Sequence, residues 1–364
     1  MEKKVAPIPR AARLVLALLL VLALSPGLTL AVSNKAIADE PEATGWNVAY
    51  TAPGSGVVAT IVVADDATSV ALTMQKSSQW SADGNGWSSA TLTLQPGGVY
   101  YLYTPLTGFI SGRTAVLPNI KADVTVDLDP DVTVIGNFFM QAYGRNCTLL
   151  TSLGVPDTSN VTTVGNEFMD QYAYGCTFET LDVPDTSNMT SVGDGFMSAY
   201  ARNVNLTALE VPDTSKMETV GTFFLFQYAY GCTSLITLAL PDTTNITAAD
   251  STFMQYFAMS CNSLDFLTAN SAPGLLATLD ADWQIPAAAM ADDEGLYVVV
   301  PANELEAWQA LTAPGKMLAL NQISDSSFVI AEGEDNGGNN NGGGIGDEDI
   351  DLAISSEEEL LAFA

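Results

Sequence analysis

The hydrophobic and polar positions in the middle of the chain recur with a fixed period. An apolar residue followed by Pro-Asp-Thr and Ser or Thr occurs four times, and its prolines are 28, 28 and 29 residues apart (Pro156, Pro184, Pro212 and Pro241). Self-similarity at such a period is typical of arrays of stacked units. Together with the apolar positions that precede each proline, which recur five times, the pattern predicts five units within residues 131–270.

Each unit carries the same ordered set of apolar residues before its proline. A Phe is followed four residues later by a Tyr or Phe, and four residues after that by Cys or Val. The three positions are occupied by Phe139, Tyr143 and Cys147; Phe168, Tyr172 and Cys176; Phe196, Tyr200 and Val204; Phe224, Tyr228 and Cys232; and Phe253, Phe257 and Cys261. This i, i+4, i+8 spacing favours one face of a helix or helical turn. A glycine stands three residues before the Phe in the first four units (136, 165, 193 and 221), and Asp250 takes its place in the fifth.

The segment after each Cys position is predicted to be a short strand that ends in a turn. In residues 235–240 the repeated apolar sites are Leu235, Leu238 and Leu240. The Pro-Asp-Thr-Ser-Asn stretch that follows favours a turn, because Pro fixes φ and Asp, Ser and Asn bond to nearby backbone. No single unit can bury its apolar face, so we expect five stacked coils with a parallel strand ladder.

These units resemble the BspA-like leucine-rich repeats of bacterial surface proteins. Phe224, the Cys-x-x-Leu of residues 232–235 and the Leu-Pro of residues 240–241 match that family best, and residues 185–190 resemble a sister repeat of the same proteins. The third unit departs from the pattern, with Val204 for Cys and Arg-Asn at 202–203 in place of Tyr-Gly. The resemblance implies an α/β fold, a short leucine-rich-repeat solenoid of about five coils plus a C-terminal cap. It also implies roles in adhesion, immune contact or scaffolding.

The flanks of the array predict further domains. Residues 39–130 contain short runs rich in β-branched and aromatic residues, which predict an all-β, sandwich-like domain with strands at 46–52, 57–64, 69–74, 90–94, 100–103 and 124–128. Residues 271–330 are expected to cap the solenoid with a strand at 297–301 and a helix that Asn303 caps, with Glu306 three residues later. In that cap Leu305, Trp308 and Leu311 would lie on the open end of the solenoid.

The two ends of the chain suggest export and a further module. Residues 1–38 have a basic start, an apolar core at 14–24 and Ala-Ile-Ala at 36–38, which is typical of a secretory signal peptide. An uncleaved membrane anchor is the alternative. Residues 331–351 are predicted to be a Gly/Asn/acidic linker, and residues 352–364 to be the start of a further module of a truncated product. The protein is therefore expected to be secreted or on the extracellular cell surface.

Charge and composition narrow the classes of function. Residues 1–38 carry five basic residues and one acidic residue, so the whole-chain charge of −30 becomes about −34 without them. Such a surface repels nucleic acid and anionic lipid, and it leaves cationic or calcium-bridged partners open. The chain has no His, which excludes Ser-His-Asp and Cys-His catalysis and His-ligated metal sites. We expect that the protein is not an enzyme and that it has no catalytic residues, no cofactor and no metal site.

The four cysteines occupy one position of the repeat, which favours buried free thiols. The alternative is a pair of disulfides, Cys147–Cys176 and Cys232–Cys261, because stacked strands lie ~4.8 Å apart.

Three groups of side chains are candidates for binding sites. A threonine recurs on the strand face of the repeats and gives it a mildly polar surface, at Thr151, Thr180, Thr207 and Thr237. This polarity alone does not indicate a binding site. A group of aromatic residues in the N-terminal region suggests either a sugar-binding platform or core packing, and core packing is favoured. The group consists of Trp80, Trp87, Tyr100, Tyr101 and Tyr103. Asp127, Asp129 and Asp131 suggest either a calcium loop or a linker into the first coil, and the linker is favoured because no glycine turn or distal Glu follows.

The sequence therefore predicts a non-catalytic binding scaffold. Its partner is expected to be a host or matrix protein or another cell-surface component, bound through the repeat array. A glycan-binding protein led by the N-terminal β-domain is the alternative.

Overall fold

A computed structural model describes residues 49–74, 77–106, 117–264, 266–269, 274–275, 297–300, 304–310 and 329–332. The predicted signal peptide, most of the predicted linker and the predicted C-terminal module lie outside the described residues. The chain divides into two compact units, 1–333 and 334–364, and every described residue belongs to the first.

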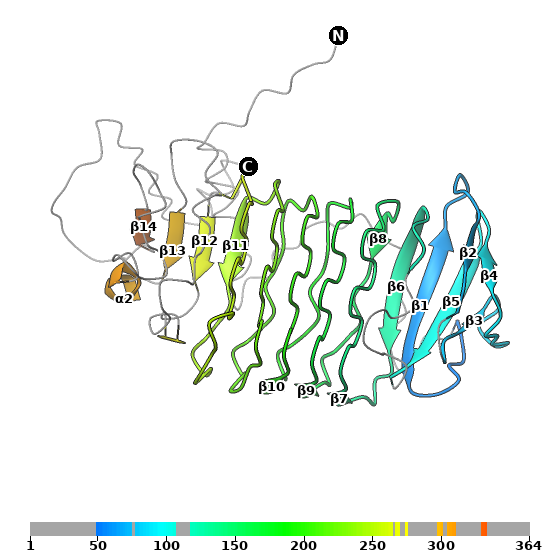
Figure 1. The fold of residues 1–364 in the computed structure, drawn as a ribbon, viewed down its shortest axis with the longest axis horizontal. Coiled ribbons are helices and arrows are strands. Elements are labelled where there is room, and N and C mark those ends of the chain that lie inside the picture. Colours follow the sequence, from blue (N-terminus) through cyan, green and yellow to red (C-terminus); the bar gives the residue numbers. More distant parts are fainter. Residues whose placement is uncertain are drawn as a thin grey trace, which may run out of the picture. The chain divides into compact units, whose positions relative to one another are not determined.

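The N-terminal region is built from short antiparallel strands (Figure 1). They are β1 (Gly56–Val63), β2 (Val70–Leu72), β3 (Gln79–Ser81), β4 (Leu92–Leu94), β5 (Val99–Pro105) and β6 (Ala122–Leu128). A five-stranded sheet has the order β3-β5-β1-β6-β8, and β2 and β4 form a separate two-stranded sheet. The sequence prediction missed β3, and residues 49–52 of the predicted strand at 46–52 are not in a strand.

The N-terminal sheet continues directly into the coils. Strand β8 (Ser152–Leu153) of the first coil pairs in parallel with β6, with Asp123 opposite Ser152 and Val124 opposite Leu153. The core is likewise shared, because Val124 and Leu128 belong to the same buried cluster as Phe139 and Leu153. The array is therefore covered at its first coil by the N-terminal sheet.

Successive coils are joined by two series of parallel strands. One series contains β7 (Val134–Ile135), β9 (Thr163–Val164) and β10 (Ser191–Val192), and a single bridge extends it to Thr219. The other contains β8 and, further along, β11 (Thr237–Leu240), β12 (Phe266–Ala269), β13 (Tyr297–Val300) and β14 (Val329–Glu332). Strand β13 occupies the segment predicted at 297–301.

The segment that carries Phe, Tyr and Cys is not helical, so the expected helical turn is wrong. Every second residue is left-handed, as at Phe138 (φ 66°), Met140 (52°), Ala142 (54°) and Gly144 (71°). Their N–H groups bond between coils, and the residues between them bond within the coil. The Ala142 N–H donates to Asp170 O at 2.7 Å, and the Tyr143 N–H donates to Met140 O at 3.2 Å.

The α/β leucine-rich-repeat fold class is therefore also wrong, and the spacing of the coils gives the physical reason. Equivalent Phe and Tyr rings of adjacent coils stack with centroids 5.1–6.1 Å apart. A helix is about 10 Å across, so one helix per coil does not fit this spacing. Among the described residues, the regular secondary structure is almost entirely strand. Within the described residues the one α-helix is α2 (Leu305–Gln309).

The helix α2 differs in detail from its prediction. Trp308 is buried as expected, with 1% of its surface exposed. The N-cap position is Glu304 rather than Asn303, and the Glu304 side chain makes no capping hydrogen bond. Leu311 lies outside the described residues.

All four cysteines are free and buried, which confirms the favoured interpretation over the disulfides. Each thiol donates to a backbone carbonyl of a preceding segment at 3.0–3.2 Å, and the acceptors are Leu117, Gly144, Ala201 and Ala229. Burial raises the pKa of Cys147 to about 11 and that of Cys176 to about 12, so both remain thiols at neutral pH.

Candidate binding groove

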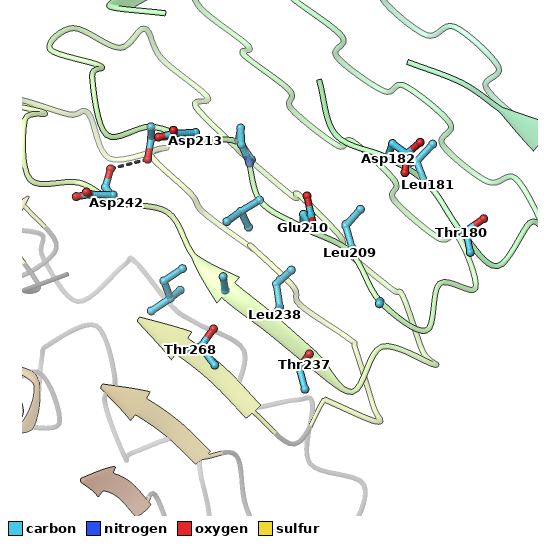
Figure 2. Close-up of a pocket in the computed structure, with 16 residues that line it drawn as sticks. Thr180, Leu181, Asp182, Leu209, Glu210, Asp213, Thr237, Leu238, Asp242 and Thr268 are labelled. Carbon is cyan, nitrogen blue, oxygen red and sulfur yellow. Dashed lines mark hydrogen bonds between the residues drawn. The ribbon is translucent and has the colours of Figure 1, made fainter. Parts of the chain in front are cut away.

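A groove of about 600 Å³ opens on the strand side of the middle coils (Figure 2). It is lined by residues 180–182, 208–214, 237–240 and 242 of successive coils, together with Thr268. Leu181, Leu209 and Leu238 form an apolar floor, with 7%, 7% and 2% of their surfaces exposed. Asp182 and Glu210 are exposed beside that floor, and they give the groove an acidic rim.

The groove lies where the second series of strands is interrupted. Strand β8 pairs with β6, and β11 pairs with β12, but residues 180–183 and 208–211 between them form no strand. Within the described part of the chain, the backbone N–H groups of these eight residues donate no hydrogen bond. Backbone donors in proteins are nearly always paired. These N–H groups are therefore open to water or to a ligand.

Three buried tyrosines account for the interruption. Tyr172 donates its hydroxyl to Gly154 O, Tyr200 to Asp182 O and Tyr228 to Glu210 O, each at 2.5 Å. A carbonyl that points inward to a phenol cannot also point sideways to the next coil, so the ladder breaks at these segments. Burial raises the pKa of all three phenols, which therefore stay protonated donors.

The fifth coil shows the converse arrangement. Phe257 occupies the tyrosine position there and has no hydroxyl. The strand of the preceding coil, β11, pairs regularly with β12. The tyrosine hydroxyls thus distinguish the open segments from the paired ones.

The structure brings together only half of the threonines noted in the sequence. Thr180 and Thr237 line the groove, and Thr207 does not. Thr151 lies at the junction with the N-terminal sheet, where its hydroxyl bonds to Ala122 O at 2.9 Å and Asp123 Oδ1 at 2.6 Å.

Sequence reasoning missed the acidic rim. Its signal was an acidic residue between Leu and Val-Pro in consecutive units, at Asp182 and Glu210.

The five N-terminal aromatic residues do not form one platform. Trp80 and Tyr100 pack against the main core, whereas Trp87, Tyr101 and Tyr103 gather around Val58 in a second cluster. The indole N–H groups are used internally, from Trp80 to Ala90 O at 3.0 Å and from Trp87 to Thr51 O at 2.8 Å. These contacts agree with the favoured interpretation as core packing.

Two of the three aspartates before the first coil accept hydrogen bonds from the protein. Asp127 Oδ2 accepts the Tyr50 hydroxyl at 2.8 Å, and Asp129 Oδ1 accepts the Asp131 N–H at 3.1 Å. In the part of the chain that the structure describes, no group of His, Cys, Asp or Glu is arranged to hold a metal ion.

A second group of titratable residues lies on the turn segments, away from the groove lining. Gln141 Nε2 donates to Glu167 Oε2 at 3.3 Å and to Asp170 Oδ2 at 3.2 Å. Burial and the neighbouring Asp170 raise the pKa of Glu167 to about 7, and burial raises the pKa of Asp170 as well. The two carboxyls therefore retain protons at a pH where isolated carboxyls have lost them.

This pair makes stability depend on pH, and Glu167→Gln is expected to reduce that dependence. The folded-state pKa of Glu167, about 7, lies above its ordinary 4.5, so the folded chain binds more protons. The free energy of unfolding should then fall as pH rises from 4.5 towards 7, and the variant should fall less. Urea unfolding across this pH range measures the slope. Glu218→Gln, at an exposed site, is the control, and equal slopes for the wild type and Glu167→Gln would contradict the expectation.

No protein-family model matches the chain, and neither a curated protein nor a solved structure matches it. The resemblance to BspA-like repeats thus stays a prediction. Among the described residues, none of the helices has the length and apolar character needed to cross a bilayer.

Proposed function

We propose that the protein is a secreted or cell-surface, non-catalytic binding protein that holds an extended, basic polypeptide segment in the groove. The segment would belong to a host or matrix protein or to another cell-surface component. The unpaired backbone of residues 180–183 and 208–211 is the observation that carries the proposal.

The backbone supports an extended ligand. An extended peptide recognises an open strand edge through main-chain hydrogen bonds, while alternate side chains enter pockets. The carbonyl oxygens of the peptide would accept hydrogen bonds from the free N–H groups of the groove. Every second side chain would meet the floor of Leu181, Leu209 and Leu238, because side chains alternate along a strand.

The charge supports a basic ligand. Asp182, Glu210 and Asp213 are exposed at the rim, and no ion pair involves them within the described residues. The whole chain has a charge of −30, which would attract cationic partners and speed their association. Lys or Arg side chains that alternate with apolar ones therefore complement both parts of the groove.

The proposal is tested by screening the full chain against an array of peptides that vary in charge and apolar pattern. We expect binding to peptides in which Lys or Arg alternates with Val, Ile or Leu. Proline substitutions along a bound peptide should weaken binding, because they remove N–H donors that face the groove carbonyls. Preference for acidic peptides, or no preference for charge, would refute the proposal.

Removing the rim charges should weaken binding to such a basic peptide. The double variant Asp182→Asn, Glu210→Gln is expected to lose about fivefold to tenfold in affinity, because an exposed ion pair contributes roughly 0.5–0.7 kcal/mol. Titration calorimetry at low and high salt measures the loss, and salt should shrink it. The control Asp131→Asn, Glu218→Gln removes two exposed acids outside the groove lining and should change affinity little.

A further inference from the structure

The outward side of the turn segments carries a row in which Arg and Tyr alternate from coil to coil. The Arg145 guanidinium carbon lies 4.9 Å from the centre of the Tyr174 ring, and that of Arg202 lies 5.3 Å from the same ring. Arg202 also lies 4.5 Å from the Tyr230 ring centre. Arg145, Tyr174, Arg202 and Tyr230 are called the Arg–Tyr row below.

Neither guanidinium pairs with an acidic side chain of the described residues. In a chain with 42 acidic and 12 basic residues, neither arginine takes part in an ion pair within the described part. Arg202 Nη1 donates to the amide oxygen of Gln227, and its Nε is buried without an acceptor. The carboxyl group of Asp170, on the same turn segment as Tyr174, is bonded by the amides of Gln141 and Gln171. The arginines therefore retain donors for an external anion.

Exposed aromatic rings extend the row. Phe223 and Tyr256 are large apolar residues with 46% and 36% of their surfaces exposed. The Phe226 ring lies between them, with centroids 5.4 Å from Phe223 and 5.6 Å from Tyr256. Phe226 directly precedes Gln227, the residue that accepts from Arg202, so the three rings adjoin the Arg–Tyr row along the chain.

This surface offers side chains but little free backbone. The N–H groups of Ala199, Asn203, Gln227 and Gly231 donate to carbonyls of the next coil at 2.6–2.9 Å. An extended peptide would find few backbone donors here, in contrast to the groove. The surface instead combines the exposed rings of Phe223 and Tyr256 with guanidiniums, which bind carboxylates in a bidentate geometry.

We propose that the Arg–Tyr row, together with Phe223, Phe226 and Tyr256, binds a carboxylated oligosaccharide. The C–H faces of the sugar rings would pack on the exposed rings of Phe223 and Tyr256, whose faces are electron-rich. The carboxylates would bond to Arg202 and Arg145. The site is separate from the polypeptide groove, so it stands or falls independently of the proposed function.

Calorimetric titration of the full chain with an oligogalacturonate tests the proposal, with a neutral malto-oligosaccharide of equal length as the comparison ligand. We expect the oligogalacturonate to bind and the neutral sugar to bind at least tenfold more weakly. Arg202→Gln should weaken oligogalacturonate binding roughly tenfold, because a hydrogen bond to a charged group is lost. The control Lys216→Gln removes an exposed cation that bonds to Asn188 outside the row, and it should leave binding unchanged.

Because Arg202 is partly buried, Phe223→Ser and Tyr256→Ser provide a second test at exposed positions. Both should weaken oligogalacturonate binding while leaving the thermal unfolding midpoint near that of the wild type. The proposal is overturned if the wild type does not bind oligogalacturonate at millimolar concentration, or if Lys216→Gln weakens binding as much as Arg202→Gln. Tighter binding of an oligoglutamate peptide than of oligogalacturonate would also overturn it, in favour of an acidic polypeptide.

Discussion

Replacing Phe196 with alanine is expected to lower the free energy of unfolding by about 3–5 kcal/mol, because a large buried side chain is lost and a cavity remains. Phe196 is fully buried between two neighbours of the same row. Its ring centroid lies 5.5 Å from that of Phe168 and 5.5 Å from that of Phe224, with the planes within 10° of parallel. Its loss therefore removes contacts with the coils on both sides.

Phe223 supplies the matched control for this substitution. It belongs to the same turn of the chain as Phe224, but 46% of its surface is exposed. Phe223→Ala should cost less than about 1 kcal/mol, because surface substitutions usually lie within ±0.5 kcal/mol and one ring contact is lost. Urea unfolding of both variants measures the difference. Equal effects would mean that the buried Phe row contributes little to stability.

The second large effect is expected at Gly221. A Cβ at this position would lie 2.4 Å from Asp194 N and 2.5 Å from Gly193 C, both in the backbone of the preceding coil. These atoms cannot move aside as the end of a side chain can. Gly221→Ala should therefore cost about 1–3 kcal/mol or more, because the two coils must separate locally.

Gly136 occupies the same repeat position but tolerates a side chain. A Cβ there would have nothing within 4 Å. Gly136→Ala should be neutral, or stabilising by about 0.4–1 kcal/mol, because alanine has less conformational freedom in the unfolded chain. Thermal and urea unfolding compare the two variants. A loss of stability in Gly136→Ala equal to that in Gly221→Ala would show that the close approach of coils is not the cause.

The fifth unit is consistent with this role for the glycines. Asp250 stands in the glycine position there, and the strand series of β7, β9 and β10 extends only to Thr219 within the described residues. The glycine repeat, visible in the sequence without an evident purpose, thus marks where one coil touches the backbone of the next.

The turn motif was readable from the sequence because its contacts are local. Asp157, Asp185 and Asp213 each accept the N–H two residues later at 2.9 Å, as expected for Asp in a turn. The motif also links coils, since Thr158 and Thr186 donate to carbonyls of the next coil at 2.6 and 2.7 Å. Spacing in the sequence gave the register of these contacts but not the contacts themselves.

The error over the helix shows where periodicity is ambiguous. Apolar residues at i, i+4 and i+8 fit a helix, and they equally fit a chain in which every second residue has a positive φ, as at residues 138, 140, 142 and 144. Only the distance between coils separates these two solutions, since rings stacked 5.1–6.1 Å apart leave no room for helices. That distance is a property of the stacked units, which no single unit encodes.

The sequence by itself determined the number of units, their register and the inward positions of Phe, Tyr and Cys, because these follow from a repeated pattern of residue types. It also determined the acidic charge and the lack of His. The tertiary structure decided the class of fold, the open groove and the Arg–Tyr row. Each of these depends on which coil lies beside which, and on whether a tyrosine hydroxyl or a neighbouring strand takes a given backbone carbonyl.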